Sequence, residues 1–154
     1  MRLLLIRHAR AESNHFVLDA ERPLTDDGRA EFRLVAQDIV DRDDSPNVIF
    51  HSPARRTTET ANLLAMAVGS TQGLLKSAAW LAMGNGCQEV LSQLAQVSTE
   101  VTAIIGHEPI MSSLTAMLMG NERFSFSPGT SACLEFDNAI EVGRGRLLWV
   151  LEPR

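Results

Sequence analysis

Three short stretches of this sequence place a histidine at or just beyond the end of a run of apolar residues, two of them beside an arginine or a hydroxyl side chain. They are Arg7-His8, His51-Ser52 with Arg56 nearby, and Gly106-His107. A neutral imidazole can attack phosphorus when its other ring nitrogen is held in place. Guanidinium groups donate charge-assisted hydrogen bonds to phosphoryl oxygens, and a second imidazole protonated beside a phosphate dianion adds another donor. This set of residue types predicts phosphoryl chemistry that needs no metal.

The apolar runs before these residues are typical of buried strands. Residues 3–6 read Leu-Leu-Leu-Ile, and residues 101–105 read Val-Thr-Ala-Ile-Ile. Buried parallel strands are near-continuous apolar runs, and open α/β sheets bind ligands just beyond the carboxyl ends of their strands. If the strands are parallel neighbours, the three histidine-bearing junctions meet along one edge of the sheet. We therefore expect two histidines and at least two arginines to converge on one cleft.

Predicted helices alternate with predicted strands along the whole chain. Thr25 is a plausible helix N-cap, followed by acid in the first turn at Asp26 and Asp27. Ser52 and Pro53 are expected to start a second helix, and two further helices are expected over residues 87–94 and 110–118. The predicted strands are 3–6, 48–50, a short one near 74, 101–105, 132–136 and 147–151. This alternation predicts one α/β domain over residues 1–154, a three-layer α/β/α sandwich with a mostly parallel central sheet.

Composition narrows the function classes. The chain has 154 residues, a formal net charge of −5 and 45% hydrophobic residues. The negative charge argues against general binding to nucleic acid or an anionic membrane. No apolar segment is long enough to span a bilayer, and the N-terminus does not have the pattern of a signal peptide. With Cys87 and Cys133 as its two cysteines, we expect reduced thiols and a cytoplasmic protein.

Motifs of several competing enzyme classes are missing from the sequence. There is no HxH or HExxH spacing for a metal, and arginines beside the histidines would repel a cation. The sequence also lacks the GxxxxGK and GxGxxG patterns of nucleotide-binding folds, as well as GxSxG and CxxC. We expect no cofactor.

The same residues resemble a known family over nearly the whole chain. The matching segments are Arg7-His8-Ala9 with Asn14, Arg22-Pro23-Leu24-Thr25 with Gly28, Ser52-Pro53-Ala54-Arg55-Arg56 with Thr60-Ala61, Gly106-His107, and Thr130-Ser131-Ala132. In this order and at these spacings they resemble the histidine phosphatase superfamily, which has the phosphoglycerate mutase-like fold. The resemblance is strongest to its small SixA-type phosphohistidine phosphatases. Those members lack the extra helical subdomain of larger relatives.

The resemblance implies a role for each matching residue. His8 would be the nucleophile that becomes phosphohistidine, while Arg7, Arg56 and His107 would form the phosphate pocket. The binding residues that the resemblance adds are Asn14, Arg22 and Ser131. Ala9 stands where the family's RHG signature has glycine, so the backbone there must avoid positive φ.

A departure from the larger members bears on the substrate. They supply a carboxylate as general acid from the middle of the chain, whereas residues 79–84 read Ala-Trp-Leu-Ala-Met-Gly. An alkoxide leaving group needs a proton, and losing such an acid commonly costs about 10²–10⁴ in rate. Imidazole is a far better leaving group. The expected substrate is therefore phosphohistidine on a protein partner, such as a phosphotransfer domain, attacked by a monomeric enzyme with an open cleft.

Two other functions stay open at the level of sequence. One is a phosphatase for small phosphate esters, and the other is a non-catalytic module that binds phosphorylated proteins. Glu12 and Glu108 are expected to be solvated carboxylates rather than general acids in catalysis. His51 is expected to have a structural role. Ser52 could cap a helix or bind within the site, and Arg22 could contact substrate or pair with a nearby acid. The large apolar residues that could form a rim for a protein partner, or simply pack in the core, are Phe16, Trp80 and Met83.

Overall fold

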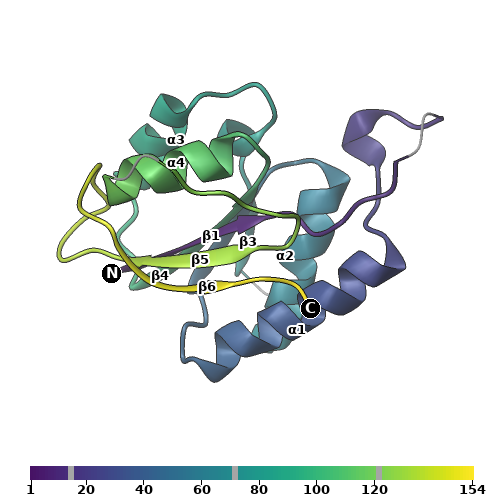
Figure 1. Cartoon of the computed structure of the whole chain (residues 1–154), viewed down its shortest axis with the longest axis horizontal. Helices are drawn as coiled ribbons and strands as arrows, with labels where there is room; N and C mark the ends of the chain where they lie inside the picture. Colours follow the sequence, from purple (N-terminus) through teal and green to yellow (C-terminus); the bar gives the residue numbers. More distant parts are fainter. Residues whose placement is uncertain (14–15, 71–72, 121–122) are drawn as a thin grey trace.

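Strands and helices alternate along the chain, as predicted (Figure 1). The computed structural model describes residues 1–13, 16–70, 73–120 and 123–154. The strands are β1 (Arg2–Arg7), β2 (Val48–His51), β3 (Leu75–Ser77), β4 (Val101–Gly106), β5 (Ser131–Glu135) and β6 (Arg146–Leu151). The α-helices are α1 (Asp26–Asp41), α2 (Arg55–Val68), α3 (Cys87–Leu94) and α4 (Ile110–Met119), with 3-10 turns η1 (Asp19–Glu21) and η2 (Ala79–Leu81).

The strands form one sheet in the order β3-β2-β4-β1-β5-β6. Strands β3, β2, β4 and β1 are parallel neighbours, and β5 and β6 continue the sheet with antiparallel pairing. The mostly parallel sheet is therefore confirmed. Because β2, β4 and β1 are adjacent and run the same way, their carboxyl ends share one edge of the sheet.

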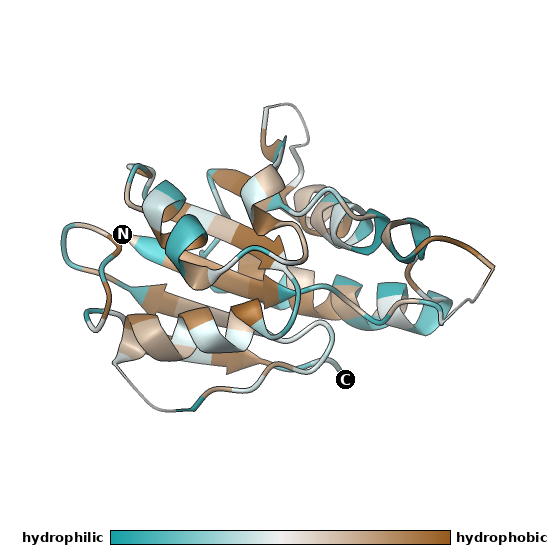
Figure 2. Ribbon diagram, turned by 90° about the horizontal axis from the view of Figure 1, so that it is seen from above, coloured by the Kyte–Doolittle hydropathy of each residue, from teal (hydrophilic) through white to brown (hydrophobic). Residues whose placement is uncertain are grey.

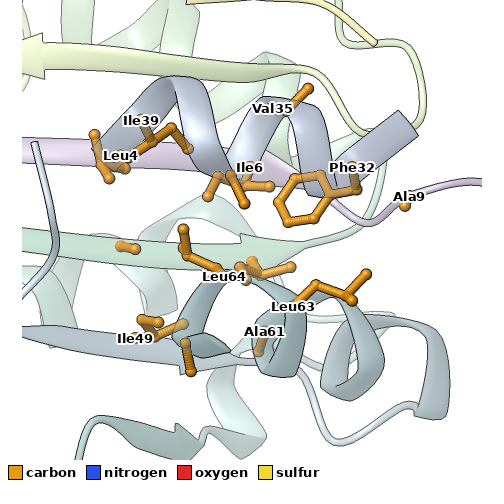
Figure 3. Packing of buried hydrophobic residues seen from close by; sticks show 14 of the residues in the cluster. Leu4, Ile6, Ala9, Phe32, Val35, Ile39, Ile49, Ala61, Leu63 and Leu64 are labelled. Atoms are coloured by element: carbon orange, nitrogen blue, oxygen red, sulfur yellow. The ribbon is translucent and has the colours of Figure 1, made fainter. Parts of the chain in front are cut away.

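Helices cover both faces of the sheet and make the predicted three layers. Alternate residues of β1 enter two separate cores, since successive side chains of a strand point to opposite faces. Leu4 and Ile6 pack with α1 and α2, whereas Leu3 and Leu5 pack with α3 and α4. Figure 3 shows the first core, where Phe32 of α1 lies between β1 and α2. In Figure 2 the strands are hydrophobic through the interior, while the helices mix hydrophilic and hydrophobic residues.

The start of α1 follows the predicted capping pattern. The Thr25 hydroxyl oxygen accepts a hydrogen bond from the Gly28 amide at 2.8 Å. Gly28 itself has no room for a side chain, because a Cβ atom there would collide with the backbone carbonyl of Arg10. These two residues hold α1 against the segment that follows β1, and so against the edge of the sheet where the histidines lie.

Removing the cap should lower stability. We expect Thr25→Ala to reduce the free energy of unfolding by about 1 kcal/mol, since the Gly28 amide loses its acceptor. Urea unfolding followed by circular dichroism measures the change. Thr25→Ser keeps the hydroxyl and should restore most of the loss. Equal losses in both variants would show that the hydroxyl bond is not the cause.

The predicted start of α2 was wrong by two residues. The helix begins at Arg55, and Ala54, whose φ and ψ are −59° and 149°, is its N-cap. Ser52 and Pro53 precede the helix, and Pro53 lies in a bend. The Ala54 carbonyl accepts from the Thr58 amide at 3.0 Å, so it closes the first helical turn. Ser52 is therefore not the N-cap of α2, and its hydroxyl instead makes a contact in the site described below.

The segment between β3 and α3 is short. Residues 78–86 hold the 3-10 turn η2 followed by a loop, in which the Asn85 side chain donates to the Ala79 carbonyl at 2.8 Å. Nothing in these residues forms a helical subdomain over the sheet edge. Among the described residues, no helix is long and apolar enough to cross a membrane. Cys87 and Cys133 are free thiols.

Candidate active site

The three predicted junctions come together at the carboxyl ends of β1, β4 and β2. The last residue of β1, Arg7, is paired in register with Gly106, the last of β4. Backbone hydrogen bonds continue the sheet beyond these residues: the His8 amide donates to the Gly106 carbonyl, and the Ser52 amide donates to the Ile105 carbonyl, both at 3.1 Å. The backbone therefore fixes the relative positions of all three junctions.

His8 has one ring nitrogen held and one available. Its Nδ1 lies 2.7 Å from the Ala9 carbonyl oxygen. A carbonyl oxygen can only accept, so Nδ1 carries the proton and Nε2 keeps a lone pair. Burial, together with the charges of Arg56 and Arg7, lowers the pKa of His8 to about 4, although the bond to Ala9 acts in the opposite direction. His8 is therefore a neutral imidazole at neutral pH, with its Nε2 suited to nucleophilic attack.

Helix α2 supports the backbone that follows His8. The Ala9 amide donates to the Thr60 hydroxyl at 3.1 Å, and that hydroxyl donates to the Arg56 carbonyl at 2.7 Å. Thr60 thus ties the nucleophile's segment to the helix that carries Arg56. Among the described residues other than glycine, positive φ occurs at Asp43, so Ala9 adopts ordinary backbone, as its replacement of glycine requires.

The two arginines of the site are each held by a loop carbonyl. Arg56 is 2% exposed, and its Nη1 donates to the Asp19 carbonyl at 2.8 Å while its Nη2 donates to the Asp19 carboxylate at 3.0 Å. Arg7 donates from Nη1 to the Phe126 carbonyl at 2.9 Å. Both arginines keep a buried Nε without a hydrogen-bond partner. Two positive charges therefore lie at the sheet edge, and each arginine has an Nε–H donor that no protein group uses.

His107 lies beside His8, with ring centroids 5.4 Å apart. Its Nε2 is 2.8 Å from the Ser52 hydroxyl, and its Nδ1 is buried without a partner. Burial and the charge of Arg56 lower the pKa of His107 to about 3. The Ser52 contact answers the question that the sequence left open, because this hydroxyl bonds within the site. A phosphate dianion at this place would favour the protonated ring, which would then donate to it.

Unsatisfied polar atoms gather at this edge. Within the described part of the chain, the buried side-chain nitrogen and oxygen atoms without a partner belong to Arg7, Arg56, His107, Thr130 and Ser131. Thr130 and Ser131 lead into β5 beside the end of β1, where the Arg7 amide donates to the Thr130 carbonyl. Leaving a buried polar group unpaired costs about 1–3 kcal/mol, so such a cluster indicates that a polar ligand completes it. The two guanidinium nitrogens are donors, and the imidazole nitrogen and the two hydroxyls can also donate, which suits an oxyanion.

Other predicted residues have more ordinary surroundings. Arg22 donates to the Asp19 carboxylate and to the Glu12 carbonyl, so it pairs with an acid in this structure. His51 is buried with Nδ1 against the Ser52 carbonyl at 2.8 Å, which fits its predicted structural role. The prediction for Glu108 was wrong, because its carboxylate accepts from the Ser112 amide and hydroxyl rather than being merely solvated. Asn14 lies outside the described residues.

Sequence reasoning missed Asp19 as a partner of Arg56. The two residues are 37 positions apart, and Asp19 lies in a stretch with no periodicity, so spacing gave no indication of the contact. The three large apolar residues that could form a rim for a protein partner differ in their exposure. Trp80 packs against Phe50 with ring centroids 5.3 Å apart, whereas Met83 is 57% exposed and Phe16 is 97% exposed. A pocket of about 190 Å³ between residues 81–85 and 107–110 adjoins His107.

The lowered pKa values can be tested directly. In an NMR titration of the free protein, the rings of His8 and His107 should titrate near pH 4 and pH 3, well below the ordinary 6.5. The unfolded chain takes up these protons from about pH 6.5 downward, so the free energy of unfolding should fall as the pH falls from 6.5 to 4. Ring titrations near 6.5 would contradict the buried, neutral pair.

The fold and site together define an α/β protein with a cluster of buried, unpartnered polar atoms at the carboxyl edge of its sheet. Residues 3–77 match the model of the histidine phosphatase superfamily (branch 1). No curated protein matches the chain. These results confirm the predicted resemblance to the histidine phosphatase superfamily, which the family model supports over residues 3–77.

Solved structures with this fold include SixA proteins. The protein histidine phosphatase SixA, solved in complex with tungstate, has a TM-score of 0.88 and 23% identity over 99% of this chain and 97% of its own. A SixA protein from Nakamurella multipartitia has a TM-score of 0.80 and 26% identity over 99% and 95%. A mycobacterial glucosyl-3-phosphoglycerate phosphatase is more distant, with a TM-score of 0.68 and 15% identity over 95% and 96%. The phosphoglycerate mutase-like fold is thereby confirmed.

Proposed function

We propose that this protein is a metal-independent phosphatase that removes the phosphoryl group from phosphohistidine on a protein. The observation that carries the proposal is the set of buried, unpaired polar atoms at the sheet edge where a neutral histidine keeps a lone pair on Nε2. Such a site can bind three phosphoryl oxygens and attack the phosphorus between them. The SixA protein that is similar in fold was solved with tungstate, an oxyanion shaped like phosphate.

The reaction would proceed in two displacements at phosphorus. The His8 Nε2 lone pair forms a bond to phosphorus, and the bond from phosphorus to the partner's imidazole nitrogen breaks, leaving its electron pair on that nitrogen. Water then attacks phospho-His8, inorganic phosphate leaves, and the His8 ring is restored. Through both steps Arg7, Arg56 and protonated His107 would hold the charge on the phosphoryl oxygens. The Ala9 carbonyl stabilises the ring as positive charge develops on it.

The choice of phosphohistidine rests on the lack of a suitable acid among the described side chains at the site. Residues 79–84 contain no carboxylate, and the Glu108 carboxylate is engaged by Ser112. Burial acts to raise the pKa of Asp19, but its bonds to Arg56 and Arg22 prevail and lower it, so it is a poor proton donor. A histidine leaving group needs no such donor when its ring is protonated beforehand, whereas an alkoxide does.

Comparing two substrates tests the proposal. The protein is incubated with a phosphohistidine-bearing phosphotransfer protein and, separately, with p-nitrophenyl phosphate, both with a chelator present. Loss of phosphohistidine at a rate well above ester hydrolysis, and no loss with His8→Ala, is the expected result. Faster ester hydrolysis would instead favour a small-molecule phosphatase. Tight binding of the phosphoprotein without turnover would indicate a binding module.

A further inference from the structure

Asp19 accepts hydrogen bonds from the guanidinium of Arg56 through both its main-chain carbonyl and its side-chain carboxylate. The main-chain carbonyl of Asp19 accepts from Nη1 at 2.8 Å, and its carboxylate Oδ2 accepts from Nη2 at 3.0 Å. The other carboxylate oxygen, Oδ1, accepts from Nε of Arg22 at 3.0 Å. One residue of η1 therefore bonds a buried arginine of the site and a second arginine in its own loop.

The pattern of these bonds leaves one edge of Arg56 open. A guanidinium has five N–H donors in a plane, and it can offer the Nε and Nη2 edge to a phosphate in a bidentate contact. Asp19 uses one donor of Nη1 and one of Nη2, whereas Nε is buried without a partner. The Asp19 contact is thus compatible with a phosphoryl group bound through Nε and the second hydrogen of Nη2.

The loop that carries Asp19 is tied at its base. Arg22 donates to the Glu12 carbonyl at 3.0 Å, and the Glu12 amide donates to the Pro23 carbonyl at 2.8 Å. In Figure 1 this segment extends beyond the end of β1 and returns past the start of α2. Asp19 has an exposed side chain, at 62%, but its acceptor atoms are held on the two arginines. The contact to Arg56 therefore comes from an anchored loop.

We propose that Asp19 is a positioning residue for catalysis: it holds Arg56 so that the Nε edge of the guanidinium faces the transferred phosphoryl group. The inference rests on the proposed function, since it concerns the same site. Arg22 shares the Asp19 carboxylate and offsets its negative charge, which reduces its repulsion of the incoming phosphate. If the carboxylate instead competed with phosphate for Arg56, removing it would strengthen phosphate binding, which is the opposite of the change that the positioning role predicts.

Three variants test the positioning role. Asp19→Ala removes the carboxylate, and it should lower kcat/KM for the phosphohistidine protein by about tenfold to a hundredfold, mostly through kcat, because a misplaced group loses transition-state contacts. Asp19→Asn keeps an oxygen that can accept from Nη2 and should recover most of that loss. Asp26→Asn is the matched control, since Asp26 also pairs with an arginine three residues on, and it should leave kcat/KM unchanged.

A binding measurement separates this inference from the proposed function. Calorimetry should show that Asp19→Ala weakens binding of inorganic phosphate about tenfold, with Asp19→Asn close to the unaltered protein. In spectra of ¹⁵N-arginine-labelled protein, the Arg56 Nε–H signal should shift on adding phosphate and broaden in Asp19→Ala. Unchanged or tighter phosphate binding by Asp19→Ala overturns the positioning role. Absence of hydrolysis, together with the expected loss of binding, overturns the proposed function alone.

Discussion

Replacing His8 with asparagine should lower the rate of phosphohistidine hydrolysis on the order of 10³-fold or more, because the attacking atom is lost. The asparagine amide can still donate to the Ala9 carbonyl, which now accepts from Nδ1 at 2.7 Å, so the local backbone should persist. The rate is measured by loss of ³²P from a labelled phosphohistidine protein. Rapid quenching should also show an acid-labile, alkali-stable phosphoenzyme in the unaltered protein and none in the variant.

His51 provides a matched control for this substitution. It is also a buried histidine at a strand end, with Nδ1 bonded to the carbonyl of the next residue at 2.8 Å. His51→Asn should therefore disturb the backbone to a similar degree but leave the phosphoenzyme intact. A phosphoenzyme that forms in His8→Asn, or rates that fall equally in both variants, would mean that His8 is not the nucleophile.

The second large effect is expected at Arg56. Lysine at this position keeps the positive charge but loses the planar pair of donors, so Arg56→Lys should reduce kcat/KM about 10²-fold. It should also weaken binding of inorganic phosphate, which calorimetry measures. Arg56 is 2% exposed and bonded to Asp19, so a lysine there also leaves those acceptors incompletely paired.

The neighbouring arginine serves as the control for Arg56. Arg55 precedes it in α2, has a side chain that is 57% exposed, and pairs with Glu59 on the helix surface. Arg55→Lys should change neither phosphate binding nor kcat/KM. If the two lysine variants behave alike, the guanidinium of Arg56 does not form the phosphate contact, and the assignment of the pocket to this edge is wrong.

The sequence was enough to predict which strands build the sheet and which residues stand at its edge. Runs such as residues 3–6 and 101–105 have the short, continuous apolar pattern typical of a buried strand, and His8 and His107 each follow one residue after such a run. The backbone then carries these residues to one place, because parallel strands end together. For this part of the site, local pattern and topology suffice.

The contacts that orient the side chains could not be predicted in the same way. Ser52 reaches His107 across 55 positions, and the Phe126 carbonyl reaches Arg7 across 119. Both partners lie outside regular elements, where no hydrophobic period reports their position. The predicted start of α2 was misplaced for a related reason, since a Ser-Pro pair is typical of a helix start but here lies before the first helical turn. Tertiary contacts decided these details.

The way in which the two arginines are held has a consequence for how this fold could diversify. The sheet places the nucleophile, but the direction of each guanidinium depends on one residue outside the sheet, Asp19 for Arg56 and Phe126 for Arg7. Changes in the loops that carry these two residues could alter the direction of the two guanidinium groups while the core and the histidine pair stay the same. Selection on substrate choice could then act largely apart from selection on stability. The loops that direct the arginines and the core that supports the fold would then change nearly independently.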